Sequence, residues 1–240
     1  MNNKPCAVIT GGSTGIGLKI VEYLLSDGYQ VINLARRPVP IEHAAITNHL
    51  VDLTDRPALE TVCLELAKCG AQTLIHNAGL IQPNLLAAVD LNDLDTLNQL
   101  HLGAAIQIAQ ALTPSMKATG FGRIVLMSSR ASVGMATRTS YAATKAGQIA
   151  MARTWALELA AHGITVNTVS PGPIEATEMF HAVVPENSEL LADLAKKIPV
   201  KRLGLPDDVA RAVRFFIAPE NSFVTGQNLF VCGGTSIGSI

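Results

Sequence analysis

The sequence predicts one α/β domain, a doubly wound parallel sheet of about seven strands with helices on both faces. Three observations predict it. Short apolar, β-branched runs alternate with longer stretches of helical periodicity, which is the pattern of βαβ units. Glycines follow four of the helical stretches, where a left-handed residue ends a helix. The chain has 240 residues, 48% of them hydrophobic, which suffices for one large core.

The strands are expected where apolar residues, many of them β-branched, form short runs. In chain order these runs are Ala7–Thr10, Val31–Leu34, a third near Asn48–Val51, Thr73–His76, Arg123–Met127, Ile164–Val169 and Leu229–Val231. Pro38 and Pro40 lie between the second and third runs, and proline interrupts helices. We therefore expect a single turn or an irregular loop in that connection.

The helices are expected where apolar residues recur at helical spacing. These stretches are Gly15–Ser26, Arg56–Lys68, Asp95–Thr119, Thr139–Ala161 and Asp207–Ala218. The first four end before glycines suited to a left-handed C-cap, namely Gly28, Gly70, Gly120 and Gly163. No linker, repeat or low-complexity segment interrupts the series, so residues 1–240 are expected to form one domain.

Composition disfavours several classes of function. The net charge is −1, whereas nucleic acid and anionic membranes call for a basic surface. No run approaches the ~20 apolar residues that span a bilayer. The N-terminus lacks the layout of a signal peptide, and the four cysteines form no Cys-x-x-Cys pair or metal-ligand pattern. We expect a cytoplasmic protein with reduced thiols, no metal, and neither nucleic acid nor membrane as a partner.

Tyr141 and Lys145 form the most informative pair in the chain. Residues at i and i+4 share one helix face, so the ammonium can lie beside the phenol. A neighbouring positive charge favours the phenolate and brings the tyrosine pKa towards the range of proton transfer. The same spacing also arises by chance in many helices, so the pair needs support from other residues.

A glycine-rich run supplies that support. Thr10–Gly17 follows the first expected strand and opens the first expected helix. Gly11, Gly15 and Gly17 would let backbone amides approach a pyrophosphate at the helix N-terminus. Turns and caps also need glycine, but the strand–loop–helix position favours a phosphate loop. The spacing is G-x-x-x-G-x-G, which differs from the G-x-G-x-x-G of two-domain dehydrogenases.

On these motifs and four others, the chain resembles the short-chain dehydrogenase/reductase family from Cys6 to about Gly234. The family's motifs occur in order as Thr10–Gly17, His76–Gly79, Met127–Arg130, Tyr141–Lys145, Pro171–Ile174 and Gly226–Gly234. The resemblance implies a Rossmann-type fold and an NAD(P)(H)-dependent oxidoreductase like the 3-oxoacyl-(acyl-carrier-protein) reductases. It also implies a cofactor half at about 1–120 and a catalytic and substrate half at about 121–240.

The resemblance also implies roles for single residues. Tyr141 would exchange a proton with the substrate oxygen, and Lys145 would lower its pKa and hold the nicotinamide ribose. Ser128 and Ser129 compete as the hydroxyl that polarises the carbonyl, and we favour Ser129, since the second serine of such a pair usually carries the role. The residues expected to contact the cofactor are Gly11, Ser13, Thr14, Gly15, Ile16, Gly17, Leu53, Asn77, Ala78, Gly79, Tyr141, Lys145, Pro171 and Gly172.

The residues after the second strand indicate the coenzyme. NAD-selective relatives place an acid there, but this chain has Arg36 and Arg37, which suit a 2′-phosphate. We expect NADP(H) to be preferred, with NAD(H) possible and a solvated basic pair as the alternative. Asp52 would bond the adenine, unless it only caps a helix, for which Thr54 or Asp55 fits better.

Further along the chain, Ile174 would present its backbone to the carboxamide. Relatives place a threonine at the position of Ala176, and Thr177 becomes the candidate if the loop carries one extra residue.

His101 is the main departure from the family pattern. It stands where relatives carry an asparagine that binds a water behind the lysine. The imidazole would hold the same water or titrate itself, and the alternative is that it only packs. His76 replaces the first asparagine of the N-N-A-G motif, where a structural role is expected.

The substrate is expected to be a small carbonyl or alcohol compound. The segment Glu178–Ile198 resembles a mobile lid whose apolar residues suggest a hydrophobic pocket. Leu190, Leu191 and Leu194 are instead expected at core positions of a short amphipathic helix. Arg130 and Arg138 flank the catalytic residues, and we expect them to be solvated or at a subunit contact rather than to bind an anion.

Two helices, 95–119 and 139–161, are apolar beyond one face and suggest a homotetramer. The leading function is NADPH-dependent ketone reduction. The alternatives are an NAD-linked secondary or cyclic alcohol dehydrogenase and a non-catalytic nucleotide-binding regulator.

Overall fold

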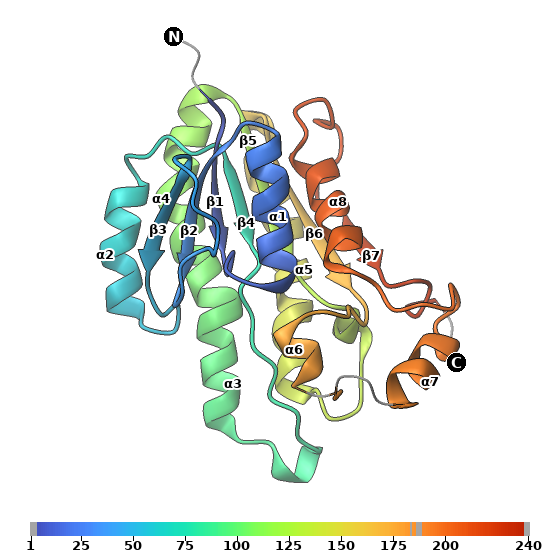
Figure 1. Cartoon of the computed structure of the whole chain (residues 1–240). Helices are drawn as coiled ribbons and strands as arrows, with labels where there is room; N and C mark the ends of the chain where they lie inside the picture. The colour runs from blue at the N-terminus through green and yellow to red at the C-terminus, as the bar shows by residue number, and fades with distance from the viewer. Residues whose placement is uncertain (1–3, 183, 186–188, 238–240) are drawn as a thin grey trace.

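One parallel sheet with helices on both faces forms the protein, as the computed structural model shows over residues 4–182, 184–185 and 189–237 (Figure 1). The strand order in the described residues is β3-β2-β1-β4-β5-β6-β7. The strands are β1 (Cys6–Thr10), β2 (Gln30–Ala35), β3 (Ile46–Leu50), β4 (Thr73–His76), β5 (Gly122–Met127), β6 (Ile164–Pro171) and β7 (Asn228–Val231). The order reverses between β1 and β4, and open α/β sheets bind ligands beyond the carboxyl ends of the strands at such a reversal.

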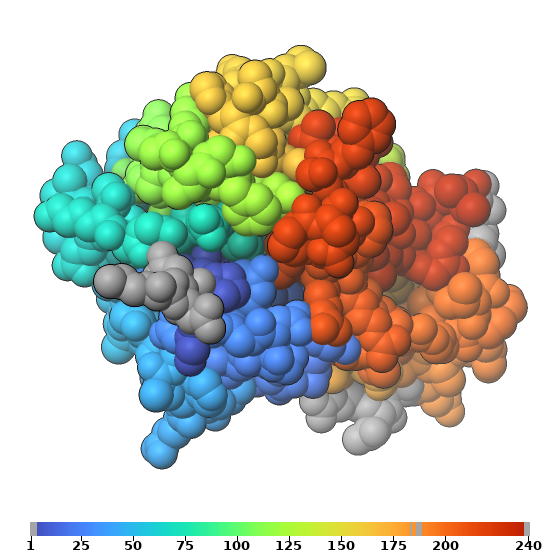
Figure 2. Space-filling view, turned by 90° about the horizontal axis from the view of Figure 1, so that it is seen from above, coloured from blue at the N-terminus to red at the C-terminus, as the bar shows by residue number. Residues whose placement is uncertain are grey.

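Two apolar layers hold the helices to the sheet. The helices are α1 (Gly15–Ser26), α2 (Arg56–Leu66), α3 (Leu91–Asn98), α4 (Ala104–Thr119), α5 (Thr139–Leu159), α6 (Glu178–His181), α7 (Glu189–Lys197) and α8 (Pro206–Ile217). Side chains of α2, α4 and α5 pack on one face, and those of α1 and α8 pack on the other. Seen from above in Figure 2, the green and yellow ends of α4 and α5 lie on one side of the molecule, opposite blue α1 and orange-red α8.

The predicted elements agree with the observed ones to within a few residues, except for the helix predicted at Asp95–Thr119. The connection between β2 and β3 has no helix, as the prolines predict. The four predicted C-cap glycines all have positive φ, between 65° at Gly120 and 80° at Gly28. The fold class predicted from the sequence is therefore confirmed, while the division into a cofactor half and a substrate half stays a prediction.

The predicted helix Asp95–Thr119 is wrong in two respects. The helical region begins earlier, at Leu91, because the Asp90 carboxylate accepts a hydrogen bond from Asn92 N at 2.8 Å and caps it. It is also interrupted by a π turn, η2 (Gln99–Gly103), which separates α3 from α4. An apolar periodicity does not reveal one extra residue per turn, and such π turns occur frequently at functional sites. His101 lies on this turn.

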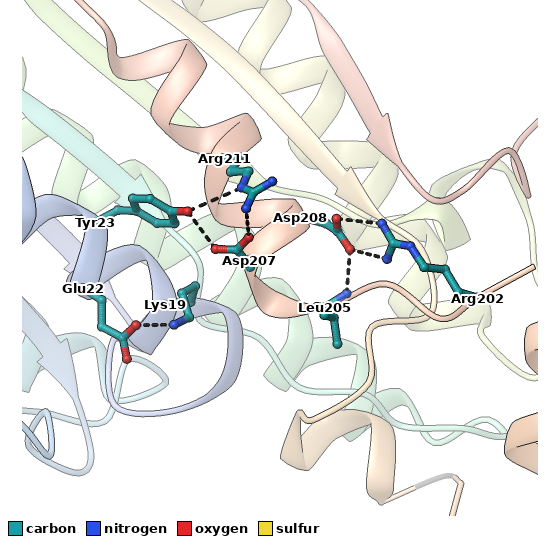
Figure 3. Close-up of polar contacts among 8 residues, drawn as sticks. All are labelled: Lys19, Glu22, Tyr23, Arg202, Leu205, Asp207, Asp208 and Arg211. Atoms are coloured by element: carbon teal, nitrogen blue, oxygen red, sulfur yellow. Dashed lines mark hydrogen bonds and ion pairs between the residues drawn. The ribbon is translucent and has the colours of Figure 1, made fainter. Parts of the chain in front are cut away.

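Helix α8 is fixed to α1 by polar contacts at its start (Figure 3). The Tyr23 hydroxyl donates to Asp207 at 2.8 Å, and Arg211 pairs with the same carboxylate at 2.6 Å. Asp208 accepts from Leu205 N at 2.9 Å, which caps the helix. These contacts lie on the face of the sheet opposite α5, the predicted catalytic helix.

The lid segment forms two short helices at the lower edge of the sheet in Figure 1. Leu190 on α7 is exposed, so the expectation of a core position there is wrong for that residue. Residues 183 and 186–188 of the segment lie outside the described residues. No helix in the described part of the chain is long and apolar enough to cross a membrane.

Candidate active site

The candidate catalytic side chains meet beyond the carboxyl ends of β4 and β5. Tyr141 and Lys145 lie on α5, one turn apart, with the Lys145 nitrogen 5.8 Å from the centre of the Tyr141 ring. Ser129 is the second residue after β5 and caps the short helix η3 (Arg130–Val133). The structure thus brings Ser129, Tyr141 and Lys145 together, as the sequence predicts.

Lys145 is buried, with 2% of its surface exposed. Its ammonium donates to the Met127 carbonyl at 2.6 Å and to Gln148 Oε1 at 3.1 Å. Burial lowers the pKa of Lys145 to about 7, since a charge loses solvation away from water. The cation is therefore held by neutral oxygen atoms.

Tyr141 is also buried, and its ring packs edge-on against His101 with 5.7 Å between ring centroids. Burial raises the pKa of Tyr141, while a hydrogen bond with Ser129 and the charge of Arg138 lower it. The expected fall of the tyrosine pKa is not seen in this structure, because burial is the largest influence. Ser129 and Arg138 oppose this effect of burial on the pKa of Tyr141.

The two serines after β5 have different surroundings. Ser128 is buried, and its hydroxyl donates to the Lys145 carbonyl of α5 at 2.7 Å. The Ser129 hydroxyl accepts from Ala131 N at 3.1 Å and bonds the Tyr141 side chain. Ser128 thus fastens the helix to the strand, and Ser129 faces the phenol.

His101 is fully buried, and both of its ring nitrogens have partners. Leu80 N donates to Nε2 at 3.3 Å, so Nδ1 carries the proton and donates to Thr144 Oγ1 at 2.8 Å. Burial, followed by the charges of Lys145 and His76, lowers the pKa of His101 well below its ordinary value. The suggestion that this imidazole titrates near neutral pH is therefore wrong.

His76 ties elements together, as expected. The Thr10 hydroxyl accepts from Asn77 N and Ala78 N, each at 3.0 Å, and bonds His76 Nδ1 at 3.2 Å. His76 Nε2 bonds the Leu100 carbonyl on the π turn at 3.1 Å. Burial lowers the pKa of His76 to about 3. This histidine is neutral and structural.

The glycine loop has no room for side chains at two of its predicted positions. A Cβ at Gly17 would lie 2.0 Å from the Gly11 carbonyl oxygen, and one at Gly11, where φ is +68°, would lie 3.1 Å from Ala78 Cα. Only glycine therefore suits these positions at the N-terminus of α1, the kind of helix end that binds phosphate groups. Asn77 Nδ2 donates to the Gly11 carbonyl at 3.1 Å and fixes the loop to the end of β4.

Other predicted cofactor residues gather at the same edge. Gly172 follows β6, and a Cβ there would lie 2.8 Å from Cys232 Cα. Ile174 is buried and pairs with Gly204 in an isolated β-bridge. Thr177 caps α6, and its Cγ2 would lie 3.1 Å from a Cβ on Gly15, so the start of the lid lies against the glycine loop.

The remaining cofactor residues follow β1, β2 and β3. The Ser13 hydroxyl donates to the Arg37 carbonyl. The Arg37 Nη2 atom donates to both carboxylate oxygens of Glu178 on α6, Oε2 at 2.8 Å and Oε1 at 3.0 Å. Asp52 accepts from Thr54 N at 2.9 Å, and the charge of Arg36 contributes to lowering its pKa. Ser13 and Leu53 are buried, and the helix α2 is capped by Asp55. The alternative of Asp52 as the α2 cap is therefore wrong.

Sequence reasoning missed Gln148, and it expected different surroundings for Arg138. Gln148 is completely buried and accepts a hydrogen bond from the Lys145 ammonium. Its place three residues after Lys145 on the same helix could have predicted this contact. Arg138 is only 8% exposed, and its Nε is buried with no hydrogen-bond partner in the described structure. The expectation of a solvated Arg138 is therefore wrong, while its place at a subunit contact stays a prediction.

Comparison with known proteins identifies the family. Residues 11–236 match the family model described as enoyl-(acyl carrier protein) reductase. The 3-oxoacyl-(acyl-carrier-protein) reductase FabG of Vibrio harveyi is 35% identical over 239 residues, which cover 95% of this chain and 96% of that protein. The chain belongs to the short-chain dehydrogenase/reductase family. As a short-chain dehydrogenase/reductase it is an oxidoreductase, and no cluster of metal-binding side chains occurs among its described residues.

Solved structures of short-chain dehydrogenases/reductases have the same fold. A putative NAD(P)-dependent gluconate 5-dehydrogenase from Beutenbergia cavernae, with bound NADP at low occupancy, superposes with a TM-score of 0.89 at 30% identity, covering 96% of each chain. The structure described as ElxO with NADP bound has a TM-score of 0.89 at 25% identity, covering 97% of this chain and 98% of that one.

Proposed function

We propose that the protein is an NADPH-dependent reductase that converts a ketone, such as a 3-oxoacyl thioester or a small cyclic ketone, to a secondary alcohol. The observation that carries the proposal is the meeting of Ser129, Tyr141 and Lys145 at the edge of the sheet where the glycine loop precedes α1. The similarity to a 3-oxoacyl reductase and to NADP-bound structures supports it.

The chemistry divides between coenzyme and protein. The bound nicotinamide would supply the hydride that reduces the carbonyl carbon. Tyr141 donates the proton that the substrate oxygen needs, and Ser129 donates a hydrogen bond to the same oxygen as its negative charge develops. The Lys145 ammonium favours the phenolate that Tyr141 becomes after giving up its proton. His101 fixes the place of α5 through Thr144.

The arginine pair supports NADPH as the coenzyme. Arg36 and Arg37 stand beyond β2 at the edge where the glycine loop lies. Hydrogen bonds from Thr54 and the charge of Arg36 lower the pKa of Asp52. Arg37 is currently paired with Glu178, so a 2′-phosphate would compete with this carboxylate.

Replacing Arg37 by methionine is expected to raise KM for NADPH roughly tenfold or more and to change KM for NADH little, since only NADPH carries the 2′-phosphate. The matched change Glu178→Gln removes the competing carboxylate, so KM for NADPH should fall while that for NADH stays the same. Steady-state rates with each coenzyme at a fixed ketone concentration measure both. Equal changes with the two coenzymes would contradict phosphate recognition by Arg37.

The proposal includes a cytoplasmic homotetramer formed through α4 and α5. Leu157 on α5 is 86% exposed, and Ile106 on α4 is also exposed, which suits a face covered by a second copy. A Leu157→Glu variant should shift the protein to smaller species in sedimentation velocity, because a buried carboxylate opposes association. An unchanged sedimentation coefficient would place the contact elsewhere.

A substrate panel tests the function. Small ketones, cyclic ketones and 3-oxoacyl thioesters are assayed by the loss of NADPH absorbance, with Tyr141→Phe as the inactive control. Turnover of at least one ketone that the control lacks is the expected result. Oxidation of a secondary alcohol with NAD⁺, and no reduction with NADPH, would favour the alcohol dehydrogenase alternative. Absence of turnover with intact NADPH binding would favour a nucleotide-binding regulator.

A further inference from the structure

Gln148 links the Lys145 ammonium to the π turn. Its Oε1 accepts from the ammonium at 3.1 Å, and its Nε2 donates to the His101 carbonyl at 3.0 Å. The side chain is completely buried, so both ends of the amide are satisfied by the protein. One residue therefore connects the catalytic helix α5 with the turn between α3 and α4.

Two carbonyls of the π turn, those of Leu100 and His101, accept hydrogen bonds from side chains. The backbone N–H of Ala104 donates to the Gln99 carbonyl, five residues earlier, so the backbone hydrogen bonds here differ from the four-residue pattern of an α-helix. The Leu100 carbonyl accepts from His76, and the His101 carbonyl accepts from Gln148. The turn is thus fastened to β4 on one side and to α5 on the other.

No carboxylate of the described residues bonds the Lys145 ammonium, whose acceptors are the Met127 carbonyl and Gln148. The titratable groups that face it are His76 and His101, both neutral, and Tyr141; Arg138 faces the phenol from the start of α5. With so few acceptors, the loss of one amide oxygen should change both the position and the charge of the lysine.

We propose that Gln148 is a positioning residue that holds the Lys145 ammonium in place for catalysis by bridging it to the His101 carbonyl. The inference rests on the proposed reductase function, in which Lys145 supports the proton transfer from Tyr141. An amide is suited to the task because it offers an acceptor to the cation and a donor to the carbonyl.

Two substitutions of nearly equal length separate hydrogen bonding from packing. Gln148→Met keeps the volume but removes both polar ends, so the pKa of Lys145 should fall and turnover should drop roughly tenfold. Gln148→Glu places a negative charge beside the ammonium, so the pKa of Lys145 should rise. Gln72→Met, at the amino end of β4 and away from both the site and the proposed subunit contact, is the matched control.

The titration of Lys145 is followed by NMR of labelled lysine side chains in the coenzyme-free protein, assigned with a Lys145→Met variant. Opposite shifts in the Met and Glu variants, with a matching displacement of the pH profile of kcat and no change in the control, are expected. A Lys145 titration that is the same in wild type and both variants would overturn the inference. If Gln148→Met does not fold, the Glu variant alone decides.

The NMR readout does not depend on turnover. If the wild-type protein reduces no ketone, the proposed function fails, while the Lys145 titration still decides whether Gln148 controls this lysine. If ketone reduction is established and the titrations do not move, only the role of Gln148 is lost.

Discussion

Replacing Tyr141 by phenylalanine is expected to lower kcat for ketone reduction about a thousandfold, within the range that general acid catalysis supplies. The change removes only the hydroxyl group. The ring keeps its place against His101, at 5.7 Å between centroids, so the site should retain its shape. Steady-state turnover with the ketone found in the substrate panel measures the loss.

NADPH binding is the control for this variant, because the phosphate loop and the arginines lie on other elements than α5. Quenching or enhancement of NADPH fluorescence should give a dissociation constant within about threefold of wild type. Turnover that stays within a few-fold of wild type would show that another group donates the proton. Loss of NADPH binding together with turnover would show that the substitution disturbs the fold.

The fold and the three candidate catalytic side chains are predictable from the sequence because local signals and family motifs indicate them. The runs that form β4 and β5 are short and apolar, and the i, i+4 spacing of Tyr141 and Lys145 places them on one helix face. Gly17 is dictated by sterics, since any side chain there would meet the Gly11 carbonyl.

The features that escape prediction depend on contacts between distant elements. The π turn at Gln99–Gly103 is held by His76 and Gln148, which come from other parts of the chain. The burial of Arg138 follows from how α5 begins, and a charged residue at a helix start is usually solvated. The pairing of Arg37 with Glu178 joins residues 141 positions apart. Neither periodicity nor motif spacing carries such information.

The candidate site also shows why Lys145 needs contacts besides the one with Tyr141 to keep its charge. Burial lowers the pKa of Lys145 and raises that of Tyr141, so both groups lose their charged forms unless other contacts oppose the effect. Ser129 and Arg138 oppose it at the phenol, and the Met127 carbonyl and Gln148 offer acceptors to the ammonium. The reactivity of the pair is therefore set by the residues around it.

Ser129→Ala and Ser128→Ala are expected to differ in what they damage. Ser129 bonds the Tyr141 side chain, and the loss of one donor to a developing oxyanion costs roughly 100- to 1,000-fold in kcat. Ser128 donates instead to the Lys145 carbonyl at 2.7 Å, so its loss should lower the free energy of unfolding by about 1 kcal/mol and leave kcat within a few-fold.

Measuring kcat and thermal unfolding for both variants separates the two serines. The adjacent positions make each variant the control of the other, because both remove one hydroxyl at the end of β5. Equal losses of turnover would mean that neither hydroxyl acts alone on the substrate oxygen. A loss confined to Ser128→Ala would reverse the assignment, and it would imply that the hold of β5 on α5, rather than a hydrogen bond to the oxyanion, limits the reaction.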